Sequence, residues 1–233
     1  MRLLHNPGMI MNVKKIRRLM RKFGLQCRIR RANPYRRMAK ALATSTIAPN
    51  VVNRAFHREA RKVLLTDITY LFFKNGKCYL STILDALTHE VLSYRVSLSL
   101  KVDFVLESVD VLIAEHGSTL DNETIIHSDQ GCHYTSYAFI QKVKDAEFVQ
   151  SMSRRGNCWD NAPQESFYGH MKDELADLIA ECTDFAAVVA QIDDWMDYYT
   201  NDRGQWDLMK LTPKEYYNYL QTGIYPLPVY KKE

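Results

Sequence analysis

Three acidic residues are placed where their carboxylates could act together on a ligand. Asp67 stands in the apolar run LLTDITYL, where an unpaired carboxylate would be costly to bury. Asp129 directly follows the apolar segment TIIHS, and Glu165 opens the segment ESFYGHMK. Clustered carboxylates repel one another unless a cation lies between them, and hard divalent cations take oxygen ligands. Two such ions can activate a nucleophile and stabilise a leaving oxygen at phosphorus, so the acids predict phosphoryl-transfer chemistry.

The segment around Glu165, NAPQESFYGHMK, has the signals of a helix N-terminus. Asn161 can cap the first free amides with Gln164 as its capping-box partner, and Pro163 is tolerated in the first turn. Glu165 and Lys172 then share one helix face. A separate apolar face, which we expect to be buried, contains Phe167, Met171, Leu175 and Leu178. A first-turn carboxylate and a Lys two turns later also describe an ordinary surface helix, so this segment alone leaves both interpretations open.

The other two acids each have a structural explanation as well. Asp67 could be a hydrogen-bonded core residue, and Asp129 could form a turn, which Gly131 would allow to be sharp. Their joint placement favours a common ligand-binding site over these separate structural explanations. Asp129 would emerge at the carboxyl end of a strand, where ligands gather in open mixed sheets, and one connection could bring Glu165 over the same edge.

The hydrophobic patterns predict the elements that would carry these residues. Asn75-Gly76 is a strong hairpin signal between two apolar runs. Strands are expected at 62–73, 77–87, 90–98, 123–128 and 147–152, and helices at 102–117, 136–146 and after Asn161. This order predicts an α/β fold, a mixed sheet with helices on its faces.

A basic arm precedes these elements. Residues 1–58 contain fifteen Lys or Arg and no acid, whereas the remaining 175 contain sixteen bases and twenty-seven acids. Such a block matches what phosphate binding requires, although a solvated disordered tail is the alternative. The segment 12–25 predicts a short basic helix, followed by an extended linker from about 26 to 60. We expect the helix to contact DNA phosphates through Lys14, Lys15, Arg17, Arg18 and Arg21.

A second basic segment, SRRGNCWDNA, lies just before Glu165. Arg154 and Arg155 could contact DNA phosphates, and Trp159 could lie against a base or pack beneath the following helix. The alternative is a core tryptophan beside two solvated arginines.

Composition excludes several classes of protein. The sequence contains no run of eighteen apolar residues and no charged-then-apolar leader, so we expect neither a membrane protein nor an export precursor. The five cysteines form no CxxC pair and match no histidine at zinc-finger spacing, which argues against a structural zinc and favours a reducing cytoplasm.

The series TDITYL, HSDQGxxYTS and SRRGNCWDNAxxESFYxxMKxE resembles the catalytic core of DDE transposases of bacterial insertion sequences. The resemblance is to the group made from two overlapping reading frames and related to retroviral integrases. It runs from about residue 50 to 213, and thirty-five residues separate Asp129 from Glu165, as in that family.

The resemblance implies an RNase H-like fold and DNA strand cleavage and strand transfer by a two-metal mechanism. Asp67, Asp129 and Glu165 fall on the metal-binding catalytic triad, with Mg²⁺ or Mn²⁺ as cofactor, and Lys172 falls on a DNA-contacting basic residue. The implied partners are element ends and target DNA, further copies of the chain on DNA, and the upstream reading-frame product as a fusion or separate protein. The implied location is the bacterial cytoplasm, at the nucleoid.

The sequence also departs from the family pattern. Only the second helix of the expected helix-turn-helix is recognised, at 12–24, and Thr200 and Gly204 replace an expected Asn and a larger residue. Two alternatives therefore stay open, a truncated DNA-binding remnant without transposition activity and a metal-dependent nuclease of the same fold. The expected organisation is a basic arm at 1–60, a catalytic core at 61–220 and a tail at 221–233.

Overall fold

The computed structural model describes residues 12–25 and 47–228. The predicted basic helix is present as α1 (Val13–Lys22), where Asn12 caps the first turn by accepting a hydrogen bond from the backbone N–H of Lys14 (2.8 Å). No residue of α1 is buried. Much of the predicted linker, residues 26–46, lies outside the described residues, so the proposed division into arm, core and tail stays a prediction.

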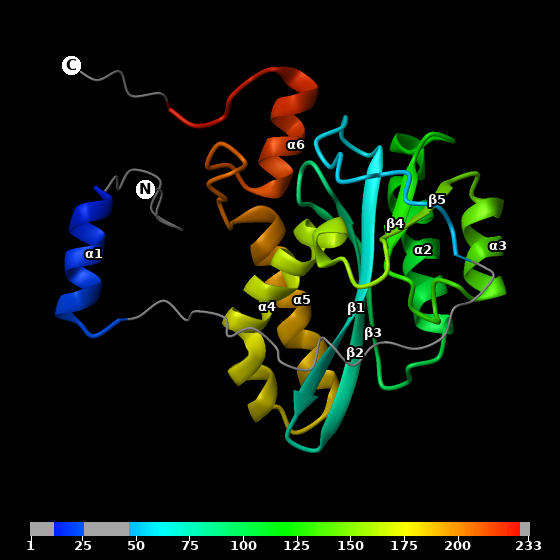
Figure 1. Ribbon diagram of the computed structural model, residues 1–233. Coiled ribbons are helices and arrows are strands. Elements are labelled where there is room, and N and C mark those ends of the chain that lie inside the picture. The colour runs from blue at the N-terminus through cyan, green and yellow to red at the C-terminus, as the bar shows by residue number, and fades with distance from the viewer. Residues whose placement is uncertain (1–11, 26–46, 229–233) are drawn as a thin grey trace.

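A five-stranded mixed sheet forms the centre of the molecule (Figure 1). Its strands are β1 (Val63–Phe73), β2 (Gly76–Asp85), β3 (Val91–Ser97), β4 (Ile125–Ser128) and β5 (Val149–Met152), in the order β3-β2-β1-β4-β5. The first three form an antiparallel meander, with the predicted hairpin at Asn75-Gly76. β4 pairs with β1 in parallel, and β5 pairs with β4 in parallel. All five predicted strands are confirmed, with both ends of each within two residues of the prediction.

Helices cover both faces of the sheet (Figure 1). On one face lie α2 (Asp103–His116) and α3 (Tyr137–Asp145), and on the other lie α4 (Ala162–Glu181) and α5 (Phe185–Asn201). A sixth helix, α6 (Pro213–Thr222), packs against α5, and short 3-10 turns occur at Gly117–Thr119 and Cys158–Asn161. This arrangement confirms the predicted α/β mixed sheet. Among the described helices, none has both the length and the apolar composition needed to cross a membrane.

The sheet separates two hydrophobic cores because successive strand residues point to opposite faces. Leu71 of β1 and Leu80 of β2 pack with Phe167 and Met171 of α4. Leu64 of β1 packs on the other side, against helices α2 and α3. By the same alternation Asp67 lies on the side of β1 that Leu71 presents to α4, whereas Val63 and Leu65, nearer the start of the strand, belong to a smaller third cluster.

Two expectations about α4 are wrong. Leu178 is 55% exposed, and Ile179 is buried in its place, because the buried residues recur every four positions and their stripe winds slowly around the helix. Asn161 makes no side-chain capping hydrogen bond. Its expected partner Gln164 is fully buried and bonds to the sheet instead, since a tertiary partner is within reach there.

Candidate active site

Two of the three predicted acids lie on neighbouring parallel strands. In the β1–β4 pair, Leu65 lies opposite His127. Two residues further along each strand are Asp67 and Asp129, so strand register brings these acids side by side at the carboxyl end of β4. On its other side Asp67 pairs with Thr82 of β2.

Hydrogen bonds fasten the first turns of α4 to the sheet beside Asp67. Gln164 donates its Nε2 hydrogen to Oγ1 of Thr82 (2.6 Å), and that hydroxyl donates to the phenolic oxygen of Tyr168 (2.9 Å). Tyr168 in turn donates to the backbone carbonyl of Asp67 (2.5 Å). Glu165 lies between these two anchoring residues in the helix. The anchors therefore set where α4 presents the third predicted acid.

The electrostatics of Asp67 report its neighbours. Burial, together with repulsion from Asp129 and Glu165, raises the pKa of this carboxyl to about 7. The Ile68 backbone N–H, which donates to Oδ1 (2.8 Å), and the positive charge of Lys172 act in the opposite direction. All four residues singled out by the sequence thus belong to one electrostatic neighbourhood.

A tight turn orients Asp129. Its Oδ1 accepts a hydrogen bond from the backbone N–H of Gly131 (2.8 Å). Asp129 stays exposed to solvent, but partial desolvation by the surrounding protein raises its pKa, while this hydrogen bond and the nearby His133 lower it. A Cβ atom at residue 131 would lie 2.8 Å from the same Oδ1, which is too close, so a larger residue there would force the Asp129 carboxylate to turn away.

The acids are neighbours but do not form a ready metal site. Within the described parts of the chain, no group of three or more His, Cys, Asp or Glu side chains is arranged to hold a metal ion. The donor chemistry of Asp67, Asp129 and Glu165, oxygen only and anionic, fits a hard divalent cation.

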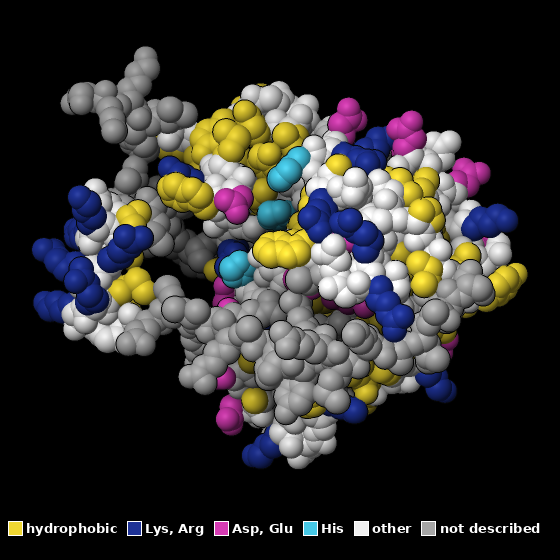
Figure 2. All heavy atoms as spheres, viewed as in Figure 1, with side chains coloured by type: hydrophobic (Ala, Val, Ile, Leu, Met, Phe, Trp, Pro, Cys, Tyr) yellow, Lys and Arg dark blue, Asp and Glu magenta, His cyan; other side chains and the backbone are white. Residues whose placement is uncertain are grey.

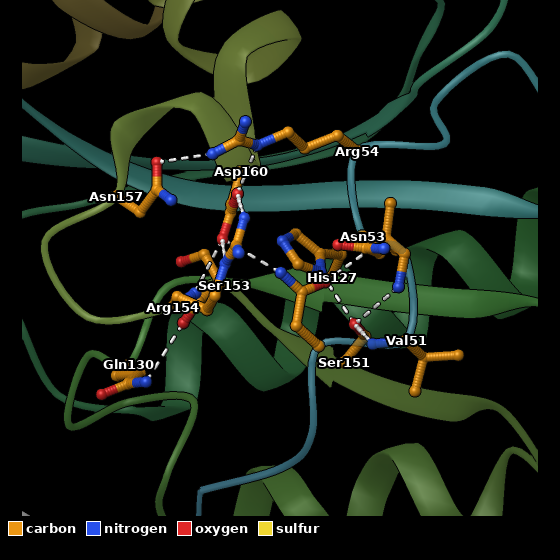
Figure 3. A network of polar contacts seen from close by, with 12 residues as sticks. Val51, Asn53, Arg54, His127, Gln130, Ser151, Ser153, Arg154, Asn157 and Asp160 are labelled. Carbon is orange, nitrogen blue, oxygen red and sulfur yellow. Dashed lines mark hydrogen bonds and ion pairs between the residues drawn. The ribbon is translucent and has the colours of Figure 1, made fainter.

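The predicted DNA-contacting residues lie in several places. Lys172 acts on Asp67 and is half-buried. On α1 the basic side chains are exposed, and Figure 2 shows them gathered on that helix. Arg155 is exposed, whereas Arg154 donates from Nε and Nη2 to the buried carboxylate of Asp160 (both 2.9 Å; Figure 3). Their contact with DNA stays a prediction.

Trp159 lies on the surface. Its exposed fraction is 70%, so the alternative in which it belongs to the core is wrong. The tryptophan belongs to the 3-10 turn that leads directly into α4. An aromatic ring is therefore exposed to solvent six residues before Glu165.

Several residues that organise the site were not predicted. They are Thr82, Tyr168, Arg54 and Asp160, together with the anchoring role of Gln164. Gln164 and Tyr168 are four residues apart, the spacing of one helix face, which could have indicated a shared contact. Nothing in the local sequence could have predicted these partners, because Thr82 lies 82 residues from Gln164 and Arg54 lies 106 residues from Asp160 along the chain.

Comparisons with known proteins identify the family and the fold of this chain. Two models described as "Integrase core domain" match residues 57–158 and 147–213. The transposase InsK for insertion sequence element IS150 of Escherichia coli is 32% identical over 92% of this chain and 74% of its own length. The solved catalytic core of BIV integrase superposes with a TM-score of 0.55 at 18% identity, over 70% of this chain and 97% of that one.

The HTLV-2 integrase catalytic core, solved in complex with magnesium, superposes with a TM-score of 0.51 at 14% identity, over 66% of this chain and 93% of that core. At such identities the two structures show the fold alone, and that fold is the RNase H-like arrangement of retroviral integrase cores. The sequence relationship goes further than the fold. The chain belongs to the family of insertion-sequence transposases with an integrase core domain.

Proposed function

We propose that this transposase cleaves DNA strands and transfers them to target DNA in a metal-dependent reaction, with Asp67, Asp129 and Glu165 as its catalytic residues. The observation that carries the proposal is that Asp129 and Glu165 both act electrostatically on Asp67 near the carboxyl end of β4, where α4 is fastened to β1. An acid whose pKa is raised to about 7 by burial and like charges is typical of a functional site.

The chain's own residues have distinct roles in this proposal. Asp67 and Asp129 would provide carboxylate oxygens from two adjacent strands, and Glu165 would provide a third from α4. Bound Mg²⁺ or Mn²⁺ ions would supply activation of a water or 3′-hydroxyl nucleophile and neutralise charge on the leaving oxygen. The hydrogen bond from Gly131 would keep the Asp129 carboxylate turned toward its neighbour.

DNA would be held by positive charge around these acids. Lys172 would position a phosphate without reading sequence, since an ammonium group acts as a point charge. Arg155 is exposed and could bind a further phosphate, while Trp159 offers a ring for base stacking. Arg154 can take part only with the face of its guanidinium that Asp160 does not use. The cations of α1 would add binding to the phosphate backbone.

The proposal extends to partners and location. We propose that several copies of the chain assemble on element ends and target DNA, that the upstream reading-frame product joins them as a fusion or partner, and that the reaction takes place in the bacterial cytoplasm. The first 60 residues would serve as the DNA-binding arm and residues 61–220 as the catalytic core.

The experiment is to incubate the full chain with Mg²⁺ and a labelled duplex carrying the end of the encoding element. Products are separated to detect both nicked and joined strands. Wild-type protein should give both, and Asp129→Asn should reduce both by more than about a hundredfold while DNA binding is retained. Asp110→Asn is a matched control, because Asp110 is a surface acid on α2, paired with Lys142 on α3, and neither helix carries one of the three acids.

The outcomes separate the alternatives. Nicked strands without joined strands would indicate a metal-dependent nuclease. DNA binding without either product would indicate a DNA-binding remnant. Full activity of Asp129→Asn would contradict the assignment of the site.

A further inference from the structure

The chain segment before the sheet is docked beside the proposed active site. The backbone carbonyl of Pro49 accepts a hydrogen bond from the N–H of Met152 on the edge strand β5 (3.3 Å), and Val51 donates its N–H to Oγ of Ser151 (2.9 Å). Val52 is fully buried, within a small cluster that includes Val63 and Leu65 of β1. Residues 47–58, which we call the docked segment, therefore cover the end of the edge strand β5 at Ser151 and Met152.

Two ion pairs hold the docked segment, from Arg54 and from Arg154 to the carboxylate of Asp160 (Figure 3). We call these three residues the ionic clasp. Arg54 donates from Nε to Oδ1 of Asp160 (2.8 Å), and Arg154 contacts both oxygens of that carboxylate (2.9 Å each). Asn50 of the docked segment also donates to Oδ2 (3.0 Å). The Asp160 side chain is fully buried, and the hydrogen bonds from Arg154 and Arg54 hold its pKa well below the ordinary range.

The backbone at Arg54 adopts an unfavourable conformation where this contact is made. Asn53 and Arg54 have φ values of 45° and 65°, two consecutive residues in the left-handed region. Asparagine tolerates that region, but arginine adopts it rarely, at a cost of order 1 kcal/mol. The strain is consistent with a segment held in place by its contacts, since Arg54 also donates from Nη2 to Asn157 (3.1 Å).

The position of Asp160 gives the clasp a second consequence. Asp160 belongs to the turn Cys158–Asn161, which continues without interruption into α4. Glu165 lies in the first turns of that helix, and the anchors Gln164 and Tyr168 hold only the side facing the sheet. The clasp restrains the same helix end from the direction of the docked segment.

We propose that Arg54 is a positioning residue which, through Asp160, holds the beginning of α4 so that Glu165 meets Asp67 and Asp129. This inference rests on the proposed function of the three acids. It makes catalytic geometry depend on how the chain leading from the basic arm is seated on the core. Arg54 itself touches no reacting atom in this scheme.

If the role of Arg54 were purely structural, its removal would disrupt the fold. Asp160 retains Arg154 and Asn50 when Arg54 is removed, and the Arg54 side chain is 46% exposed, so its loss should leave the fold intact. A direct role in DNA binding also predicts a different result, because it would weaken the affinity for DNA rather than slow the reaction.

The test compares full-length wild-type protein with Arg54→Ala, Arg54→Lys and the control Lys142→Ala, which breaks a surface ion pair with Asp110. Amide hydrogen exchange is measured over residues 153–166, and Mg²⁺-dependent cleavage is measured against DNA concentration. Arg54→Ala should speed exchange in this segment and lower kcat, each by about tenfold, with KM changed less than about twofold. Arg54→Lys should restore part of both, and Lys142→Ala should match the wild type.

Two results would overturn the inference. One is unchanged exchange at 153–166 in Arg54→Ala, and the other is a raised KM with kcat unchanged. If wild-type protein shows no Mg²⁺-dependent cleavage, the proposed function is wrong, and the exchange measurement still decides whether Arg54 holds the start of α4.

Discussion

The phenolic hydroxyl of Tyr168 on α4 donates a hydrogen bond to the backbone carbonyl of Asp67 on β1 (2.5 Å). The helix that carries one proposed catalytic acid is therefore bonded to the backbone of another. Because the contact is made to the main chain, it fixes the spacing of α4 and β1 without using the Asp67 carboxylate. The Tyr168 hydroxyl also accepts a hydrogen bond from the Thr82 hydroxyl, which itself accepts one from the Gln164 side chain. A buried polar chain thus sets the geometry of the site.

Replacing Tyr168 by phenylalanine should separate packing from this hydrogen bond. The ring remains within the core beside Phe167, but the Asp67 carbonyl and the Thr82 hydroxyl lose a partner. We expect the free energy of unfolding to fall by about 1–3 kcal/mol and strand cleavage to slow. Urea unfolding measures the first effect. Tyr94→Phe, which removes a hydroxyl bonded to surface Asp193, is the control and should change cleavage little.

The raised pKa of Asp67 predicts how stability and metal binding vary with pH. Its ordinary value is 3.8 and its folded value is about 7, so between these values the folded state holds a proton that the unfolded state lacks. The stabilising contribution of this group is therefore present at low pH and lost as pH rises through about 7. A divalent cation favours the ionised form, so Mg²⁺ should raise Tm more at pH 8 than at pH 6.

Thermal unfolding at the two pH values, with and without Mg²⁺, measures this effect. Asp67→Asn should abolish most of the Mg²⁺ response and flatten the pH dependence near pH 7. An equal Mg²⁺ response at both pH values would show that the cation binds elsewhere.

Gly131 is expected to be required for activity rather than for folding. A Cβ at this position would lie 2.8 Å from Oδ1 of Asp129, and the carboxylate can relieve the clash only by turning away. Gly131→Ala should therefore lower kcat for cleavage by about tenfold or more, while the free energy of unfolding changes by less than about 1 kcal/mol. Gly117→Ala, with only ordinary contact to Ile113, is the matched control. Normal kcat in Gly131→Ala would mean that the orientation of Asp129 is unimportant.

Lys172 should serve the substrate rather than the metal. Its charge lowers the pKa of Asp67, so removing it should make that carboxyl harder to ionise while leaving the acid ligands in place. We expect Lys172→Ala to weaken DNA binding at the site, with a salt dependence shallower by about one unit, and to retain Mg²⁺ affinity measured by calorimetry. A loss of Mg²⁺ affinity with DNA binding unchanged would instead make Lys172 a charge balance within the acid cluster.

The sequence predicted most elements because their patterns are local. β1 and β2 flank a turn-forming Asn75-Gly76 pair, and α2, α3 and α4 begin within a residue or so of their expected starts. The triad was identified through resemblance, and the register Leu65–His127 explains why Asp67 and Asp129 meet. Contacts between distant segments could not be predicted. The local pattern predicted that Gln164 is a capping residue, whereas in the folded chain Gln164 donates a hydrogen bond to Thr82 in the sheet. Arg54 and Asp160 are likewise brought together only by folding.

The basic helix α1 should bind DNA through charge, with little dependence on base sequence. Base readout by a helix needs a recognition helix held at a fixed angle by packing, and no residue of α1 is buried. Each phosphate contact contributes about −0.9 to the slope of log affinity against log salt concentration. Replacing five of the six cations of α1 by glutamine should make this slope shallower by up to about 4.5 units. The five are Lys14, Lys15, Arg17, Arg18 and Arg21. The same number of replacements on the core should have a smaller effect, and suitable positions are Lys74, Lys77, Lys101, Lys142 and Lys144.

In competition binding at physiological salt, element-end duplex should be preferred over scrambled duplex by less than about a hundredfold, and a larger preference would show that α1 reads bases.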